Sequence, residues 1–165
     1  LLPAGPLREG TWRLQYADML IYNGSKPDEA MMANNASLLM KLAASHVVQI
    51  NTGKKLPLAA FLTQWQSINA VAGIGDPQRF FDTLQTLGFH LMKQQGFVDH
   101  KRFTADDFNQ FNHSKVILPL LMTEKDAVKC RAFAQDNWWY LPVNALFSEQ
   151  DEQIIRQKMQ VIATS

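Results

Sequence analysis

The fold is decided by residues 67–87, which read SINAVAGIGDPQRFFDTLQTL. Residues 67–72 are mostly apolar or small, which is typical of a strand that is buried on both faces. Asp76 then stands at the position of a helix N-cap, Pro77 takes the first helical position, and the apolar residues that follow, from Phe80 to Leu87, share one helical face. A buried strand that leads directly into an amphipathic helix is the repeating unit of a parallel sheet with crossover helices.

The same order of strand and helix recurs on both sides of this stretch. Downstream, the pattern predicts strands over 89–92, 116–122 and 138–143, and helices from Thr104, over 127–134 and over 151–163. Upstream, it predicts a short helix over 7–15, a strand over 17–22, two extended segments within 38–51 and a helix over 58–65. The extended segments permit a β-hairpin in the N-terminal third. We therefore expect an α/β fold whose sheet is mainly parallel.

Composition narrows the class of protein. The chain has 165 residues and 47% hydrophobic content, which suits one ordinary core. Its 16 Lys and Arg against 15 Asp and Glu give no strong positive field, so nucleic acid is not an expected partner. Cys130 is the only cysteine, so no internal disulfide is possible, and the four histidines do not have the spacing of zinc ligands. The longest apolar run, 116–122, is too short to span a bilayer. A cytoplasmic compartment fits best.

Three loops are expected to meet at one edge of the sheet. Residues 73–76, 97–100 and 123–126 each follow a predicted strand, and the carboxyl ends of parallel strands share an edge where ligands bind. Each loop leads to a predicted helix start, which can hold an anion. Asp76 and the acidic pair in 123–126 would repel a polyphosphate unless Lys125 or Mg²⁺ neutralised them.

No complete nucleotide-binding motif is present in the sequence. The nearest approach to a Walker A motif, Thr52-Gly53-Lys54-Lys55, lacks the first glycine and the final hydroxyl residue. Gly73-Ile74-Gly75 lacks the third glycine of a dinucleotide fingerprint, and no Gly-x-Ser-x-Gly elbow occurs. We therefore expect no complete ATP site within this chain.

Five segments resemble successive motifs of the tetraacyldisaccharide 4'-kinase family, in the family's order. They are LPAGPLRE (2–9), AGIGDPQRFF (72–81), FVDH (97–100), MTEKDAVKC (122–130) and NWWYLPV (137–143). Together they cover nearly the whole chain, and residues 26–65 match least. The chain departs from the family at Gly10, where members often have proline.

The resemblance implies the carboxy-terminal lobe of a P-loop-type kinase. Residues 1–25 would link to an amino-terminal lobe that carries the Walker motifs and a membrane-anchoring helix, 26–65 would be variable, and 66–165 would form the α/β core. The whole enzyme would transfer the γ-phosphate of ATP, with Mg²⁺, to the 4'-hydroxyl of tetraacyldisaccharide 1-phosphate in lipid A biosynthesis. It would act at the cytoplasmic face of the inner membrane of Gram-negative bacteria. The chain alone would be inactive, hold no tightly bound cofactor and tend to self-associate.

The resemblance also assigns candidate roles to particular residues. His100 would be catalytic, working with an acidic residue of the other lobe, although the sequence alone favours a loop histidine that is hydrogen-bonded for structure. Asp99 would either orient His100 or cap the turn. Arg8 would contact phosphate, while Glu9 would bind a metal-bound water or fix Arg8. As surface residues, Arg8 and Glu9 would instead form a solvated charge pair.

Supporting roles fall to the remaining loop residues. Gly73 and Gly75 would allow close approach of the backbone. Thr123 to Asp126, including Glu124 and Lys125, would form a capping box that fixes its loop. No metal ligands are assigned to this chain.

Two other functions remain open at this point. The chain could be a stand-alone α/β binding or regulatory module without catalytic activity, in which case no Walker A motif would belong to the same protein. A dinucleotide oxidoreductase domain rests only on Gly73 and Gly75, and calorimetry with NAD(H) would test it.

Overall fold

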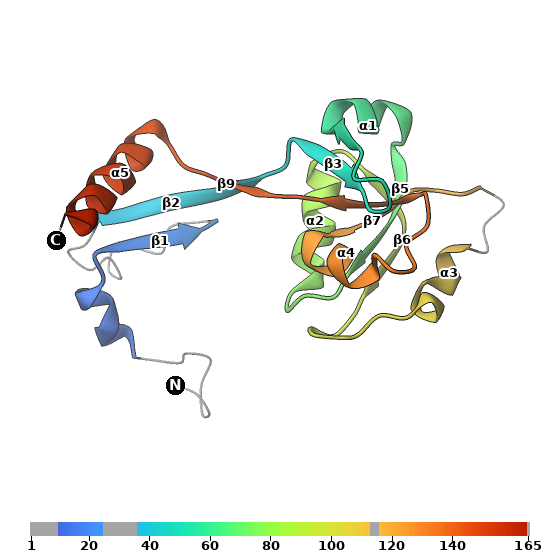
Figure 1. Ribbon diagram of the computed structural model, residues 1–165, viewed down its shortest axis with the longest axis horizontal. Coiled ribbons are helices and arrows are strands. Elements are labelled where there is room, and N and C mark those ends of the chain that lie inside the picture. Colours follow the sequence, from blue (N-terminus) through green and yellow to red (C-terminus); the bar gives the residue numbers. More distant parts are fainter. Residues whose placement is uncertain (1–9, 25–35, 113–115, 165) are drawn as a thin grey trace. The chain divides into compact units, whose positions relative to one another are not determined.

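The computed structural model describes residues 10–24, 36–112 and 116–164 (Figure 1). They fall into two compact units. One unit is continuous and runs from Ala44 to Val143, and the other combines the residues up to Ala43 with those from Asn144 onward.

The continuous unit is built on a six-stranded sheet in the order β4-β3-β8-β7-β5-β6. The strands are β3 (His46–Gln49), β4 (Lys55–Pro57), β5 (Ser67–Ala72), β6 (His90–Gly96), β7 (Leu120–Thr123) and β8 (Trp138–Leu141). Strands β6, β5, β7 and β8 pair in parallel, whereas β3 pairs antiparallel with both β8 and β4. The predicted α/β fold with a mainly parallel sheet is therefore confirmed.

Helices cover both faces of this sheet. They are α1 (Leu58–Gln64), α2 (Pro77–Thr86), the 3-10 helix η3 (Ala105–Phe108), α3 (Asn109–Asn112) and α4 (Glu124–Cys130). Trp139 packs with residues of α1 and α2 in one hydrophobic cluster, and Trp138 packs with residues of η3, α3 and α4 in another. Because neighbouring residues of a strand point to opposite faces, the two clusters lie on opposite sides of the sheet.

Helix α2 forms as its sequence signals predict. The Asp76 side chain accepts a hydrogen bond from Arg79 N at 3.3 Å, and Pro77 occupies the first turn. Phe80, Phe81 and Leu84 are buried along one face. The loop that precedes α2 is thus fixed at both ends, by buried β5 and by a capped helix.

Several predicted boundaries are wrong for identifiable reasons. The strand expected over 116–122 begins only at Leu120, because Pro119 has no N–H to donate to a ladder, and Ile117 before it is 76% exposed. The helix expected from Thr104 is only the short pair η3 and α3, the helix expected over 127–134 ends at Cys130, and β8 stops before Pro142.

The second unit contains a three-stranded sheet in the order β1-β2-β9. Its elements are the 3-10 helix η1 (Thr11–Tyr16), β1 (Met19–Asn23), β2 (Ala36–Ala43), β9 (Asn144–Leu146) and α5 (Glu149–Ala163). Ser148 caps α5 by accepting a hydrogen bond from Asp151 N at 3.1 Å.

One expectation for this region needs correction. The described part of the helix predicted over 7–15 is a 3-10 helix, η1, which begins at Thr11. The β-hairpin predicted near the N-terminal third is formed by β3 and β4, which pair antiparallel, whereas β1 and β2 pair in parallel. Within the described ranges, no helix has the length and apolar character needed to cross a membrane.

Candidate functional site

The three loops at the carboxyl ends of β5, β6 and β7 are joined by side-chain contacts. Lys125, in the first turn of α4, donates a hydrogen bond from Nζ to Asp99 Oδ1 at 2.7 Å. The next residue, Asp126, accepts a hydrogen bond at Oδ2 from Gly73 N at 2.8 Å. The start of α4 therefore contacts the loop after β5 and the loop after β6, and we call these three loops the loop cluster.

Asp126 is the buried centre of the loop cluster, with 0% exposure. Besides Gly73 N, its carboxylate accepts hydrogen bonds from Thr123 Oγ1 at 2.6 Å and from Lys129 Nζ at 3.0 Å. Thr123 also caps α4, because its Oγ1 accepts from Asp126 N at 3.2 Å. Three donors, one of them charged, compensate the burial of this carboxylate.

Only one of the two predicted loop glycines needs to be glycine for steric reasons. A Cβ on Gly73 would lie 2.8 Å from Phe103 Cζ and 3.0 Å from Asp126 Oδ1, so a side chain there would displace the Phe103 ring and crowd the buried carboxylate. A Cβ on Gly75 would meet no atom of the described residues within 4 Å. Among the described residues, the backbone is closely approached at Gly73 and not at Gly75.

His100 projects from the loop cluster with its side chain 84% exposed. Its backbone has a φ of +63°, a left-handed conformation that is uncommon for a residue with a side chain. Asp99 contacts it twice: Oδ1 accepts from His100 N at 2.9 Å, and Oδ2 lies 3.4 Å from His100 Nε2. The imidazole is therefore open to an incoming group on most of its surface.

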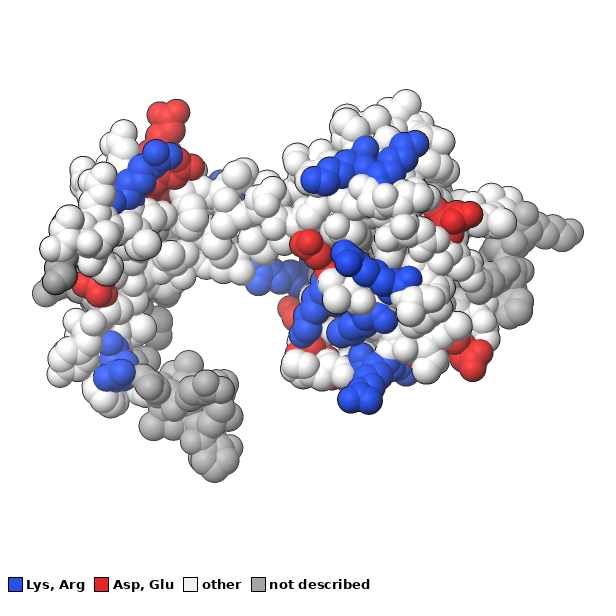
Figure 2. Space-filling model, in the orientation of Figure 1, with Lys and Arg blue, Asp and Glu red and all other residues white. Residues whose placement is uncertain are grey.

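Lysine side chains neutralise the carboxylates near this edge. The hydrogen bond from Lys125, followed by the contacts of His100, lowers the pKa of Asp99 below its usual value. Lys101 Nζ lies 2.6 Å from Asp107 Oδ1 and, together with Thr104, lowers the pKa of Asp107. Figure 2 shows Lys and Arg side chains gathered over this part of the continuous unit, with acidic side chains among them. Of the three acidic residues expected to repel phosphate, Asp126 is paired with Lys129, whereas Lys125 pairs with Asp99.

The remaining candidate residues are placed as follows. Glu124 is an exposed residue in the first turn of α4, beside Lys125. Arg8 and Glu9 lie outside the described residues. In the part of the chain that is described, no three His, Cys, Asp or Glu side chains are grouped so as to hold a metal ion.

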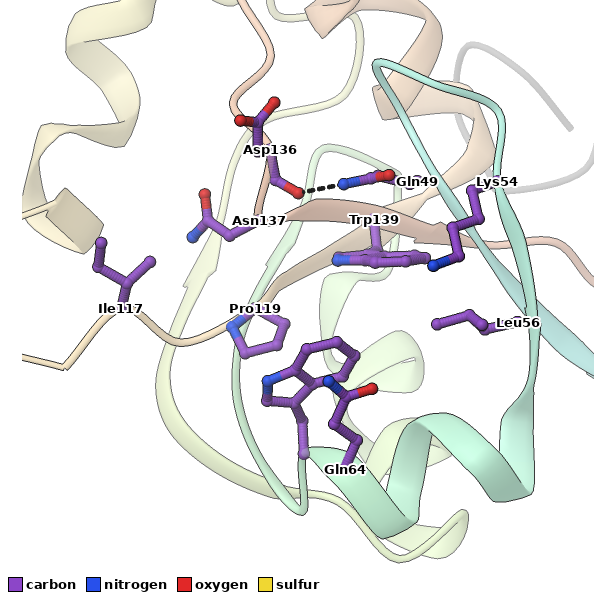
Figure 3. A pocket seen from close by; sticks show the side chains of 10 residues that line it. Gln49, Lys54, Leu56, Gln64, Ile117, Pro119, Asp136, Asn137 and Trp139 are labelled. Atoms are coloured by element: carbon purple, nitrogen blue, oxygen red, sulfur yellow. Dashed lines mark hydrogen bonds between the residues drawn. The ribbon is translucent and has the colours of Figure 1, made fainter.

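A pocket of about 380 Å³ lies away from the loop cluster, at the amino ends of the parallel strands (Figure 3). The indoles of Trp65 and Trp139 form part of its wall, with ring centroids 6.1 Å apart. Pro119 and Asn137, which precede β7 and β8, also line it. None of the candidate site residues that the structure describes lines this pocket, so the pocket is separate from the loop cluster.

Comparison with known proteins points to one family. Residues 1–160 match the family model described as tetraacyldisaccharide-1-P 4'-kinase, LpxK. The chain is 50% identical over 165 residues to the tetraacyldisaccharide 4'-kinase of Colwellia psychrerythraea, covering 100% of this chain and 47% of that protein. It is 47% identical over 165 residues to the kinase of Shewanella frigidimarina, covering 99% of this chain and 45% of that protein. The chain thus spans about half the length of the curated relatives it matches.

A solved structure agrees at the level of the fold. The chain is similar to LpxK of Aquifex aeolicus, crystallised in complex with ATP, with a TM-score of 0.64. The match covers 93% of this chain and 45% of that one, at 22% sequence identity. At this identity the likeness shows a shared fold.

Proposed function

The chain belongs to the tetraacyldisaccharide-1-P 4'-kinase family, and on that premise we propose that it forms the carboxy-terminal lobe of such a kinase. The whole enzyme transfers the γ-phosphate of ATP to the 4'-hydroxyl of tetraacyldisaccharide 1-phosphate, in lipid A biosynthesis at the cytoplasmic face of the inner membrane. An amino-terminal P-loop lobe binds ATP and Mg²⁺ and provides the membrane anchor. Within this chain, residues 1–25 link to that lobe, 26–65 vary among relatives, and 66–165 form the core.

The observation that carries the proposal is the loop cluster within a chain that matches the family over 1–160. Open parallel sheets bind ligands at the carboxyl ends of their strands, and here that edge presents an exposed histidine beside paired charges. Phosphoryl transfer needs reactants held in line, charge neutralised and a group that receives the proton of the attacking hydroxyl. This edge offers the group that receives the proton, His100.

His100 is the proposed catalytic residue of this lobe. Its exposed imidazole reaches towards the other lobe and pairs with an acidic residue there, so that the pair receives the proton of the 4'-hydroxyl. Asp99 fixes His100 by accepting a hydrogen bond from its backbone N–H. Arg8 contacts phosphate and Glu9 fixes Arg8 or a metal-bound water, as their place in the family motif indicates.

A domain-exchange experiment tests this function. We expect no phosphorylation when the chain alone is mixed with ATP, Mg²⁺ and tetraacyldisaccharide 1-phosphate. In the Colwellia kinase, the matching 165 residues are replaced by this chain, and the exchanged enzyme should phosphorylate the acceptor. A folded exchanged enzyme without activity, or full activity of the chain alone, would contradict the proposal.

Self-association of the isolated chain is part of the same proposal. In the discontinuous unit, Tyr16, Met159 and Val161 are each more than half exposed. Exposed apolar side chains of this kind favour association when no partner covers them. Sedimentation velocity should show oligomers that grow with concentration, and a clean monomer at high concentration would contradict this part.

A further inference from the structure

We propose that Lys125 is a positioning residue, which sets the orientation of His100 by holding Asp99. The kinetic part of this inference rests on the proposed function, whereas the structural part does not. The two residues are 25 positions apart in the sequence and belong to different loops, so no local motif connects them.

The connection runs through a single oxygen atom. Asp99 Oδ1 accepts a hydrogen bond from Lys125 Nζ at 2.7 Å and another from His100 N at 2.9 Å. Lys125 therefore fixes Asp99 Oδ1, and this oxygen in turn holds the backbone N–H of His100. The other oxygen, Oδ2, faces the imidazole at 3.4 Å from Nε2. Loss of the Lys125 contact would leave the Asp99 carboxylate held, among the described residues, by His100 alone.

The backbone at His100 needs such support. Val98 O accepts a hydrogen bond from Lys101 N at 3.3 Å, which closes a four-residue turn with His100 in its third position. A positive φ at this position is usually taken by glycine or asparagine, because a Cβ crowds the backbone there. A left-handed histidine persists where its surroundings enforce the conformation, and such residues concentrate at functional sites.

Lys125 has a firm base from which to act. Its backbone lies in the first turn of α4, between the cap residue Thr123 and the buried carboxylate of Asp126. Its ion pair with Asp99 is itself exposed, with side chains 48% and 36% accessible. Exposed pairs contribute little to stability, so the contact acts on orientation more than on folding.

Orientation matters here because packing does not supply it. The His100 side chain is 84% exposed, so few neighbouring atoms restrict its rotamer. A catalytic group displaced by about 1 Å can lose about a hundredfold in rate. A lysine remote from the reacting atoms can therefore affect turnover through Asp99.

The structural test uses the chain itself. Lys125→Met, Lys125→Arg and the control Lys101→Met are compared by NMR. Lys101 carries the same charge next to His100 but pairs with Asp107. In Lys125→Met, the pKa of Asp99, followed by its carboxyl ¹³C shift, should rise towards its usual value, and the His100 amide resonance should move. Lys125→Arg should leave both signals and the melting temperature near those of the wild type, and Lys101→Met should leave both signals near those of the wild type. An unchanged Asp99 titration and His100 amide in Lys125→Met would overturn the inference.

The kinetic test uses the exchanged Colwellia enzyme. Lys125→Met should lower kcat about tenfold or more with little change in the KM for ATP, Lys125→Arg should restore most of the loss, and Lys101→Met should stay within about twofold of the wild type. Equal losses in Lys125→Met and Lys101→Met would overturn the inference and leave the proposed function standing. An inactive wild-type exchange would count against the proposed function, and the NMR comparison would still decide whether Lys125 orients His100.

Discussion

His100 combines an exposed side chain with a constrained backbone. Its imidazole is free of close packing, while its φ of +63° is held by the turn from Val98 to Lys101 and by Asp99. Chemistry and conformation at this position can therefore be separated by substitution.

Glycine and alanine at position 100 should differ in stability. Alanine keeps the unfavourable left-handed backbone, whereas glycine adopts it freely, so His100→Gly should unfold with a free energy about 1 kcal/mol higher than His100→Ala. Urea denaturation of the two variants measures the difference. Equal values, or a more stable alanine variant, would show that the turn does not impose a positive φ in solution.

Cys130 offers a test of the core behind α4. Its side chain is 0% exposed, and burial, with a further contribution from Asp126, raises the pKa of the thiol to about 12. We expect the native chain to resist a thiol reagent such as DTNB at pH 8, and the urea-unfolded chain to react at once.

The same thiol predicts a pH dependence of stability. The unfolded thiol ionises above about pH 8.5, whereas the folded thiol stays protonated until about pH 12, so ionisation stabilises the unfolded state. The free energy of unfolding should fall as pH rises above about 8.5, and Cys130→Ala should remove that component. Rapid reaction of the native thiol would contradict this picture of a closed core.

The first turn of α4 organises the loop cluster through two adjacent residues. Asp126 points inward and holds Gly73 N, Thr123 and Lys129, while Lys125 points outward and holds Asp99. The contacts of Asp126 stabilise the fold, whereas the contact of Lys125 with Asp99 orients His100.

This division predicts different costs for substitutions in one helical turn. Asp126→Ala should lower the free energy of unfolding by about 3 kcal/mol, because it leaves buried Gly73 N unsatisfied and removes the partner of Lys129. Glu124→Ala, at an exposed position of the same turn, removes a favourable charge at the helix N-terminus and should cost less than about 1 kcal/mol. Equal losses in thermal or urea unfolding would contradict the central role of the Asp126 carboxylate.

Local signals in the sequence predict some of these elements well. Strand β5, the Asp76 cap and helix α2 lie within 21 consecutive residues and depend on contacts between neighbours, so the spacing of apolar residues is sufficient. Thr123 was recognisable as a cap for the same reason. The contact of Asp126 with Gly73 crosses 53 positions, and that of Lys125 with Asp99 crosses 26, and no spacing rule reveals either.

Apolar composition predicted one strand region wrongly and gave no signal for strand β9. Residues 116–119 have the composition of a buried strand, yet Val116 and Ile117 are exposed because Pro119 interrupts the ladder. Strand β9 is three residues long and all exposed, so no burial pattern marks it, and its pairing with β2 could be found only from the structure.

The division of the chain into two units is a property that length and composition do not show. Both hydrophobic clusters, on the two faces of the six-stranded sheet, draw only on residues between Ala44 and Val143. The continuous unit therefore has the core that independent folding requires.

We expect residues 44–143, expressed alone, to fold cooperatively. The amide resonances of β5, β7 and β8 should overlay on those of the full chain in a heteronuclear NMR spectrum, since their neighbours are all retained. A collapsed spectrum without dispersed amides would show that the discontinuous unit is needed to form the sheet.

The central claim is that this chain supplies the histidine edge of a lipid kinase, and the most direct measurement is turnover of the exchanged Colwellia enzyme carrying His100→Ala. We predict that kcat falls about a hundredfold or more while the melting temperature stays within about 2 °C of the unsubstituted enzyme, because an exposed loop side chain contributes little packing. Turnover within about twofold of the unsubstituted enzyme, or a large loss of stability, would contradict the claim.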